Sequence, residues 1–497
     1  MHRKLEWPRG SYHRYYHDVL TDRALVGLQE ATHKGRVLTA REDLLTYASD
    51  ATPLLRQTPA AIVIPADAEE VAAILALANE EGFAVVPRGA GTGLSGGAVP
   101  TESSVVLLFP SWNRIQEIDV ANATAWVEPG VVTADLHAAV EAEGLFYPPD
   151  PGSMRVCTIG GNVAENAGGL RGLKYGVTKD YVQGLEAVLP TGEWVRLGGK
   201  AVKDVAGYGL KDLLVGSEGT LAVFTRVLVR LVPKPVRTRT LLAGFGSLAA
   251  AGEAVATILA ERIVPCTLEI LDAVTIGAVE AFGNLGLPQG LEALLLIEVD
   301  GHPAAVEDES HAVGAICRRL GARRVRRATS EEEAEDLRSA RRAAFSALAR
   351  LGPTAILEDA TVPRSAVPEM LVRIREIADR HGATFGVFGH AGDGNLHPTC
   401  LTDVRDRNAI LRAEAAFEEI FAAAIALGGT ITGEHGVGLA KRRFLARQVG
   451  DASVRFMRQI KAVLDPHHVL NPGKVFEPGP RCEHPPLGHP RYAEALA

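Results

Sequence analysis

The chain has 497 residues, a formal net charge of −8 at pH 7 and 47% hydrophobic residues. This length exceeds what one hydrophobic core usually organises, so it predicts two or three globular domains. The acidic balance argues against a nucleic-acid-binding protein, because the arginine run at 318–327 is compensated at once by the glutamates at 331–335.

The cysteines and the apolar runs indicate in which cellular compartment the protein works. The five cysteines form no CxxC pair, which argues against a disulfide framework and against an iron–sulfur cluster in this chain. The first residues lack the apolar core of a signal peptide, and no stretch reaches the ~18 uninterrupted apolar residues of a membrane span. We therefore expect a cytoplasmic protein without an integral membrane segment, in which any membrane contact is peripheral and made through a partner.

Changes in composition along the chain predict five segments, with the prolines at 233 and 235 marking the main boundary. The segments are an N-terminal helical arm at 1–54, an α+β domain at 55–235, a second domain at 236–430, a C-terminal segment at 431–477 and a disordered tail at 478–497.

The first domain carries the clearest local signals. A strand at 61–64 leads through Asp67, a typical N-cap residue with Glu70 three positions on, into a helix that Gly82 ends. The later elements are expected as strands at 83–86, 105–109, 123–128 and 221–231, a helix at 133–143, a hairpin at 185–197 about Thr191 and Gly192, and two C-terminal helices at 441–449 and 453–464.

A glycine-rich loop at 87–97 contains Gly91-x-Gly-x-x-Gly96, which formally matches a dinucleotide fingerprint. That fingerprint requires a helix directly after the loop, and the short stretch at 98–104 leaves no room for one. The loop can still turn successive N–H groups inward to bind an anion, with ordinary tight turns as the alternative. Further glycine-rich stretches at 158–170 and 216–221 favour a phosphate-bearing cofactor.

In combination these motifs resemble the FAD-linked oxidases with a PCMH-type FAD-binding domain, in particular the branch of glycolate oxidase D subunits and D-lactate dehydrogenases. The resemblance runs from about Ala60 to Phe476 and is carried by the segments at 87–97, 150–153, 158–169, 202–221 and 470–474. It implies an α+β fold of the vanillyl-alcohol-oxidase type, in which a PCMH-type domain is followed by a cap and substrate domain with an antiparallel sheet.

The same resemblance implies FAD bound without a covalent bond. Cys157 lies beside a flavin loop, but we interpret it as a packing residue, since a buried thiol usually behaves as a small hydrophobic group. The positions expected to bind the cofactor are Arg88, Gly89, Gly91, Thr92, Gly93, Ser95, Gly96, Asp150, Ser153, Thr158, Gly161, Asn162, Asn166, Gly168, Gly169, Gly176, Glu218, Gly219 and Asn471.

The segment at 384–398 is predicted to form a β-hairpin with Asp393 and Gly394 as a two-residue turn. This turn would make His390 and His397 direct cross-strand partners, with Cβ atoms about 5 Å apart on one face. Two imidazoles at this spacing can bind one metal ion. The alternative is a pair of histidines whose ring nitrogens are satisfied by backbone groups.

The resemblance adds the remaining members of this site. In the family, the HxxxxxxH motif and the Glu of a Glu-His pair hold a divalent metal, zinc or manganese, and the following His acts as the base. Carried over, the ligands are His390, His397 and Glu434, and the base is His435. A Lewis acid and a neutral imidazole promote loss of the hydroxyl proton while hydride passes to flavin N5.

Two further positions concern the substrate. The family places an arginine before the metal hairpin, which corresponds to Arg341 and would bind the substrate carboxylate; Arg338 and Arg342 are expected at the surface. Members that act on 2-hydroxyglutarate use a lysine where this chain has Leu357. This departure favours a monocarboxylate.

The sequence thus predicts FAD-dependent oxidation of a small D-2-hydroxy acid, of the lactate or glycolate type, with electrons passing to a protein or quinone acceptor. One alternative is a flavin subunit of a multi-chain glycolate oxidase that works with an iron–sulfur subunit. Another, from a different class, is a metal-dependent hydrolase with merely structural glycine loops. A homodimer is one compatible assembly.

Overall fold

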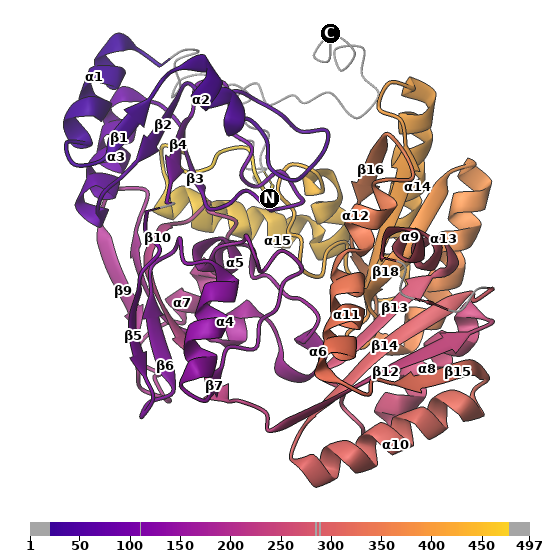
Figure 1. Ribbon diagram of the computed structural model, residues 1–497. Helices are drawn as coiled ribbons and strands as arrows, with labels where there is room; N and C mark the ends of the chain where they lie inside the picture. The colour runs from indigo at the N-terminus through magenta and orange to yellow at the C-terminus, as the bar shows by residue number, and fades with distance from the viewer. Residues whose placement is uncertain (1–19, 110, 284–285, 288–289, 477–497) are drawn as a thin grey trace, which may run out of the picture.

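The computed structural model describes residues 20–109, 111–283, 286–287 and 290–476 (Figure 1). The expected tail at 478–497 and the start of the expected N-terminal arm lie outside these residues. Helices alternate with one mixed sheet and several antiparallel sheets, so the α+β class is confirmed.

The first sheet joins the N-terminal arm to the first domain. Its strands, in spatial order, are β1 (Arg36–Leu38), β2 (Ala61–Ile64), β4 (Val105–Leu108) and β3 (Val85–Arg88), with β1 antiparallel to β2 and the other pairs parallel. The arm is therefore not purely helical as predicted. Besides α1 (Asp22–Ala31) and α2 (Arg41–Thr46) it supplies β1, because Val37 and Leu38 pack against the buried side chains of this sheet.

The helix α3 (Ala68–Glu81) follows its sequence signals. The Asp67 carboxylate accepts the Glu70 backbone N–H at 3.0 Å, and Gly82 ends the helix in the left-handed conformation with φ 69°. Between β3 and β4 the structure describes every residue and forms no helix. The glycine loop therefore lacks the following helix that a nicotinamide-binding fingerprint needs.

The second sheet of the first domain is antiparallel. Its strands, in spatial order, are β5 (Ile115–Asp119), β6 (Thr124–Val127), β10 (Val223–Arg230), β8 (Val182–Val188) and β9 (Trp194–Gly198). The predicted hairpin about Thr191 and Gly192 is the β8–β9 pair. The remaining elements of this domain are α4 (Thr133–Ala142), β7 (Leu145–Phe146), α5 (Ile159–Glu165), α6 (Gly172–Tyr175), η2 (Thr178–Asp180), α7 (Leu210–Leu214) and β11 (Val232–Pro233).

The second domain is built on one antiparallel sheet, which we call the cap sheet. Its strands, in spatial order, are β15 (Ala322–Arg327), β12 (Arg237–Phe245), β14 (Ala293–Gly301), β13 (Thr267–Asp272), β18 (Thr384–His390), β19 (Asn395–Thr402) and β16 (Thr354–Leu357), with β17 (Ala360–Thr361) also paired to β19. Its helices are α8 (Leu248–Ala260), α9 (Ala273–Gly283), α10 (Pro303–Arg319), α11 (Glu331–Arg342), α12 (Ala344–Leu348), η3 (Arg364–Ala366), α13 (Val367–His381) and α14 (Arg407–Ala426).

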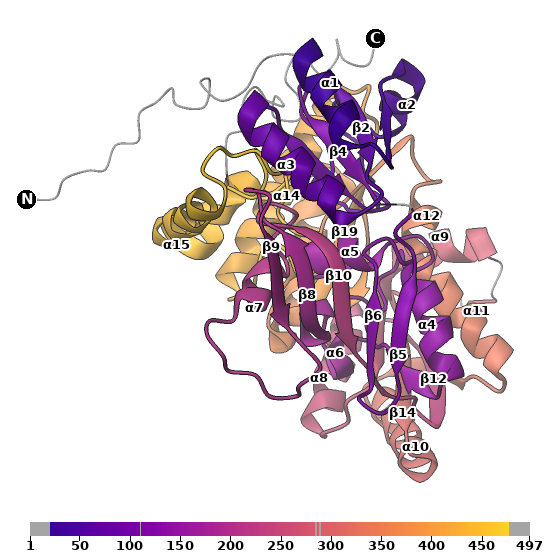
Figure 2. The same ribbon diagram turned by 90° about the vertical axis from the view of Figure 1, so that its left-hand side faces the viewer.

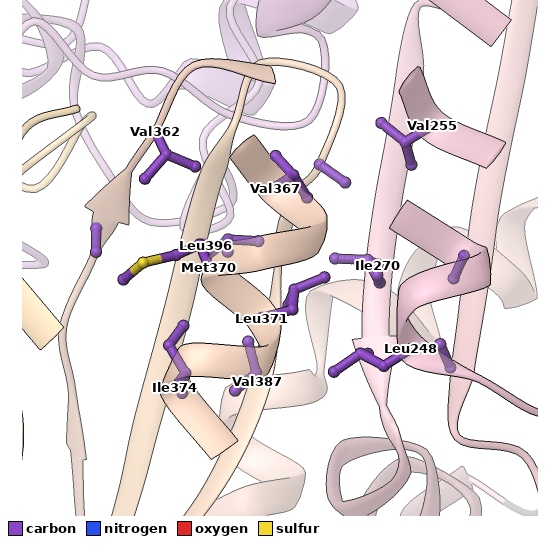
Figure 3. Close-up of a cluster of buried hydrophobic side chains, with 14 of the residues drawn as sticks. Leu248, Val255, Ile270, Val362, Val367, Met370, Leu371, Ile374, Val387 and Leu396 are labelled. Atoms are coloured by element: carbon purple, nitrogen blue, oxygen red, sulfur yellow. The ribbon is translucent and has the colours of Figure 1, made fainter. Parts of the chain in front are cut away.

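One face of the cap sheet carries a hydrophobic core. Figure 3 shows Leu371 and Ile374 of α13 close to Val387 of β18, with Ile270 of β13 on the side of α8. All four are buried, and burying an aliphatic side chain of this size contributes about 1.5–3 kcal/mol. Alternate residues of the same strands point to the opposite face, where they meet α9, α11, α12 and the first domain.

The C-terminal segment returns to the first domain. The helix α15 (Arg442–Leu464) is interrupted at Gly450, where φ is 80°, so it comprises two helices as predicted. Figure 2 shows α15, in yellow, to the left of the second sheet. Ile460 and Leu464 of α15 pack against the core of that sheet, and Leu470 then pairs with Val85 of β3. Within the described residues, none of the helices combines the length and apolarity needed to cross a membrane.

Candidate active site between the two domains

A cavity of about 520 Å³ lies between the two domains. Its first-domain wall consists of glycine-rich stretches at 87–98, 151–170 and 218–224, and its second-domain wall comes from α11, α12, β16, β18 and β19. Glu434 and His435 of the C-terminal segment complete the lining. Cofactor and ligand pockets typically enclose about 300–1,000 Å³, so this cavity has the size of a binding site.

Many of the residues predicted to bind the flavin line this cavity. They are Arg88, Gly89, Gly91, Thr92, Gly93, Ser153, Thr158, Gly161, Asn162, Gly168, Glu218 and Gly219. Two of the glycine loops touch here: a Cβ at Gly89 would lie 2.3 Å from Thr158 Oγ1. The close approach of these loops therefore depends on the missing side chain.

The other predicted flavin positions do not line the cavity. They are Ser95, Gly96, Asp150, Asn166, Gly169, Gly176 and Asn471. Gly169 adopts φ 136° and a Cβ there would lie 2.0 Å from the Asp150 carbonyl oxygen, while the Asn471 amide donates to the carbonyl oxygens of Gly97 and Glu218. Gly169 and Asn471 therefore hold neighbouring loops together behind the cavity wall.

The predicted metal hairpin forms, but in a different register. The strands pair Phe388 with His397 and His390 with Asn395, so the prediction that the two histidines are direct cross-strand partners is wrong. The turn spans 391–394, because the N–H groups of both Asp393 and Gly394 donate to the His390 carbonyl oxygen. A shift of two residues leaves both imidazoles on the same face, since side chains alternate with period two.

His390, His397 and Glu434 converge on one point. The Nε2 atoms of His390 and His397 lie 3.0 Å and 3.3 Å from Glu434 Oε1, and the potential ligand atoms of all three residues lie within 4.8 Å of one another. The two imidazole rings are 5.1 Å apart and nearly perpendicular. Two imidazoles and a carboxylate are a donor set that suits zinc and similar divalent ions.

The charges of this cluster suit metal binding. Burial opposes the charged form of His390, yet Glu269 and Glu434 raise its pKa well above the usual value. Burial lowers the pKa of His397 to about 4. Burial opposes ionisation of Glu434, but His390 and His397 hold its pKa well below the usual value. Glu434 and His397 are therefore in the ionised and neutral forms that bind metals, whereas His390 has to lose a proton when a metal binds.

The turn that carries Glu434 and His435 is held by two carboxylates from other elements. Asp359 accepts the backbone N–H groups of Gly433, Glu434 and His435 at 2.7, 2.9 and 3.3 Å. Glu218 accepts those of Val437 and Gly438 at 2.8 and 2.6 Å. Glu218 thus anchors this turn as well as lining the cavity.

His435 lies inside this cluster with its ring stacked on that of His397, 5.0 Å away. Its Nδ1 is 3.7 Å from Asp359 Oδ1, and the buried Lys441 ammonium pairs with the same carboxylate. Burial lowers the pKa of His435, although Asp359 opposes the shift. A neutral imidazole at neutral pH is the form that can accept a proton.

Arg341 lies in the cavity wall and is buried. Its guanidinium stacks over the Phe388 ring at 4.7 Å and forms an ion pair of 2.5 Å with Glu269. Its Nε has no hydrogen-bond partner among the described residues. A buried guanidinium with an unused donor beside the histidine cluster is suited to a substrate carboxylate.

The two neighbouring arginines are not surface residues as expected. The side chains of Arg338 and Arg342 are 12% and 14% exposed. Arg338 pairs with Glu298 at 2.9 Å, and Arg342 lines the cavity and pairs with Asp150 at 3.2 Å. Arg338, Arg341 and Arg342 share one face of α11, and that face is buried by pairing with Glu298 in the second domain and Asp150 in the first.

Sequence reasoning missed Glu269, Asp359 and Lys441. Each is a charged residue that is fully or almost fully buried. The sequence did contain a signal for the role of Glu269, because this residue stands between two apolar residues, Leu268 and Ile270, in the strand Thr267–Asp272. An isolated carboxylate in such a run implies a charged partner, but the sequence does not say which one.

The residues present fit both an FAD and a divalent metal. Glycines of three loops line the cavity, and Arg88, another lining residue, has a buried Nε without a hydrogen-bond partner among the described residues, as suits an anionic cofactor. The His390, His397 and Glu434 cluster supplies the donor set for the metal.

The fold and cavity define an FAD-dependent oxidoreductase, and comparison with known proteins places it more narrowly. Residues 59–198 match the family model "FAD binding domain", and residues 234–475 match "FAD linked oxidases, C-terminal domain". The chain belongs to the FAD-linked oxidase family. The hydrolase interpretation loses its basis, because the glycine loops are part of an FAD-binding domain.

Individual relatives agree with this assignment. The chain is 52% identical over 432 residues to "Glycolate oxidase subunit GlcD" of Bacillus subtilis, covering 87% of this chain and 92% of that protein. It is 34% identical over 472 residues to "D-lactate dehydrogenase" of Anaerostipes hadrus, covering 93% and 98%. Substrate-bound p-cresol methylhydroxylase is similar in fold, with a TM-score of 0.77 and 17% identity over 92% of this chain and 96% of that one. The predicted PCMH-type fold is confirmed.

The variant Gly93→Val tests the cavity as the FAD site. A Cβ at Gly93 would meet no atom closer than 3.9 Å, so the new side chain has room in the protein and fills cavity space instead. We expect a folded protein whose FAD binding is weaker by about 1–3 kcal/mol, the usual cost of overpacking. FAD absorbance per mole of protein, with circular dichroism for the fold, measures this.

The matched control is Gly199→Val, at a glycine that also has open space around it but lies outside the cavity. This control should retain wild-type FAD content. Normal FAD affinity in Gly93→Val would contradict the placement of the cofactor.

Proposed function

We propose that this enzyme oxidises a small D-2-hydroxy acid, of the lactate or glycolate type, to the 2-oxo acid. The observation that carries the proposal is the convergence of His390, His397 and Glu434 beside His435 and Arg341 in the wall of the flavin cavity. The names of the relatives, a glycolate oxidase subunit and a D-lactate dehydrogenase, support this substrate class.

His390, His397 and Glu434 would hold a divalent metal, zinc or manganese. Such an ion, when bound, polarises the substrate hydroxyl and lowers its pKa. Glu434 contributes the negative charge of the ligand set, and burial keeps water away from its carboxylate. The turn anchored by Asp359 and Glu218 keeps Glu434 within reach of both imidazoles.

His435 is the proposed base that accepts the hydroxyl proton. Its neutral form is favoured by burial, and Asp359 near Nδ1 stabilises the imidazolium that forms. Arg341 would bind the substrate carboxylate and so fix the orientation of the α-carbon toward the flavin wall. The glycine loops would hold FAD, which when bound supplies the hydride acceptor of the reaction.

The substrate side of the cavity favours a short side chain. Leu357 and Phe388 line it and are 7% and 5% exposed, so they present an apolar wall next to Arg341. A second carboxylate would lose its hydration there without gaining a cation. We therefore propose a monocarboxylate substrate.

The electrons would leave to a protein or quinone acceptor. The B. subtilis relative is named a subunit, which supports work with partner chains, including an iron–sulfur subunit that supplies the cluster this sequence lacks ligands for. We place the enzyme in the cytoplasm, with peripheral membrane contact through such a partner.

The variant His390→Ala tests the metal site. It removes one ligand from the second domain and leaves the glycine loops intact, so we expect loss of bound Zn²⁺ and a fall in turnover of at least about 100-fold, with FAD content unchanged. Metal analysis, FAD absorbance and D-lactate turnover with a dye acceptor measure the three effects. His311→Ala, at an exposed histidine of α10, is the control. Loss of FAD from His390→Ala would contradict the proposed division of roles.

The variant Leu357→Lys tests substrate choice. An ammonium in the apolar wall would bind a second carboxylate, and a hydrogen bond to a charged group contributes about 1.5–3 kcal/mol. We expect the ratio of kcat/KM for D-2-hydroxyglutarate to that for D-lactate to rise by about tenfold or more. Leu351→Lys adds the same charge at an exposed position and should leave this ratio unchanged. An unchanged ratio in an active Leu357→Lys enzyme would show that this wall does not select the substrate.

A further inference from the structure

Glu269 is a buried carboxylate whose two oxygens contact different parts of the candidate site. It lies on β13, the neighbour of β18 in the cap sheet, and is 0% exposed. Its Oε1 lies 2.7 Å from His390 Nδ1, and its Oε2 lies 2.5 Å from an Arg341 terminal nitrogen. Glu269 itself does not line the cavity.

Burial of the Glu269 carboxylate costs free energy unless its contacts with His390 and Arg341 are both made. All residues of β13 are buried, and an unpaired carboxylate in such an environment costs several kcal/mol. In the β13–β18 pairing Ile270 lies opposite Gly389. Extending this antiparallel register by one residue places Glu269 opposite His390. The carboxylate therefore reaches the imidazole by strand pairing and the guanidinium by the packing of α11 on the sheet.

We propose that Glu269 is a positioning residue that sets the metal-binding imidazole of His390 and the carboxylate-binding guanidinium of Arg341 at the same time. This inference rests on the proposed function and deepens it. Glu269 touches neither substrate nor metal; it acts through the two residues that do.

The contact with His390 fixes which ring nitrogen is free. Oε1 accepts the Nδ1–H, so Nε2 is the ring nitrogen that faces Glu434 and His397 and that would bind a metal once its proton is lost. Carboxylates behind metal-binding histidines orient the ring and increase its basicity, and their loss typically lowers metal affinity about 10–100-fold.

The contact with Arg341 fixes the position of the guanidinium that would bind the substrate carboxylate. Oε2 forms an ion pair with one terminal nitrogen, without hydrogen-bond geometry, while the Phe388 ring supports the guanidinium plane; among the described residues Nε also lacks a hydrogen-bond partner. Because a single carboxylate holds both groups, the spacing between the metal and the substrate carboxylate is set by one side chain.

The variant Glu269→Gln tests this coupling. The amide oxygen can still accept from one partner, but the amide nitrogen then faces the other partner as a second donor. We expect Zn²⁺ affinity of the FAD-loaded, metal-stripped protein to fall about 10–100-fold in titration against a chelator, and KM for D-lactate at saturating Zn²⁺ to rise about tenfold or more. FAD absorbance should not change. Glu269→Asp keeps the charge on a shorter side chain and should fall between wild type and Glu269→Gln in both measurements.

The matched control is Glu298→Gln on the adjacent strand β14. Glu298 is also buried and also pairs with an arginine of α11, Arg338, at 2.9 Å, but it lies outside the cavity. This control lowers thermal stability to a similar degree and should keep Zn²⁺ affinity and KM within about twofold of wild type.

Unchanged Zn²⁺ affinity or unchanged KM in both Glu269 variants would overturn the proposal, since coupling requires both to shift. Equal shifts in Glu298→Gln would also overturn it, because they would reflect general destabilisation of the sheet. Failure of the proposed function looks different: the wild-type protein would then bind no Zn²⁺ or oxidise no 2-hydroxy acid.

Discussion

Neighbouring residues of a β-strand point to opposite faces of the sheet, and in the cap sheet this alternation separates two environments. Ile270, Val387 and Leu396 point into the hydrophobic core under α8 and α13. Glu269, next to Ile270 in β13, and His390, three residues beyond Val387 in β18, point to the opposite side. The core face keeps the strands in register, and that register decides which charged groups meet on the other face.

Charged groups on a buried face need partners, and the structure supplies them from distant parts of the chain. Glu434 comes from the C-terminal segment, and its turn is fixed by Asp359 from the cap sheet and Glu218 from the first domain. Both carboxylates accept backbone N–H groups of the turn, and buried charged groups in general add little net stability compared with apolar packing. Their effect is to specify one arrangement, so the closure of the two domains around the cavity and the assembly of the cluster depend on each other.

Much of the first domain could be predicted because its signals are local. Asp67 with Glu70, Gly82 and the Thr191–Gly192 turn each act through hydrogen bonds within a few residues. The hairpin register could not be predicted, since Asp393-Gly394 suits a two-residue turn, whereas both N–H groups bond to the His390 carbonyl in the folded protein. The burial of Glu269 depends on Arg341, and the burial of Arg342 depends on Asp150. Both partners lie more than 70 residues away in sequence. No local pattern encodes such pairings.

The central claim is that one cavity holds an FAD and a metal that act on the same substrate. Anaerobic mixing of the FAD-loaded enzyme with D-lactate, followed through the flavin absorbance, tests it most directly, because no electron acceptor is needed. If the metal and the FAD act on the same substrate, flavin reduction is slow after a chelator has stripped the metal, and added Zn²⁺ or Mn²⁺ restores its rate. Flavin reduction at the same rate with and without metal would contradict it.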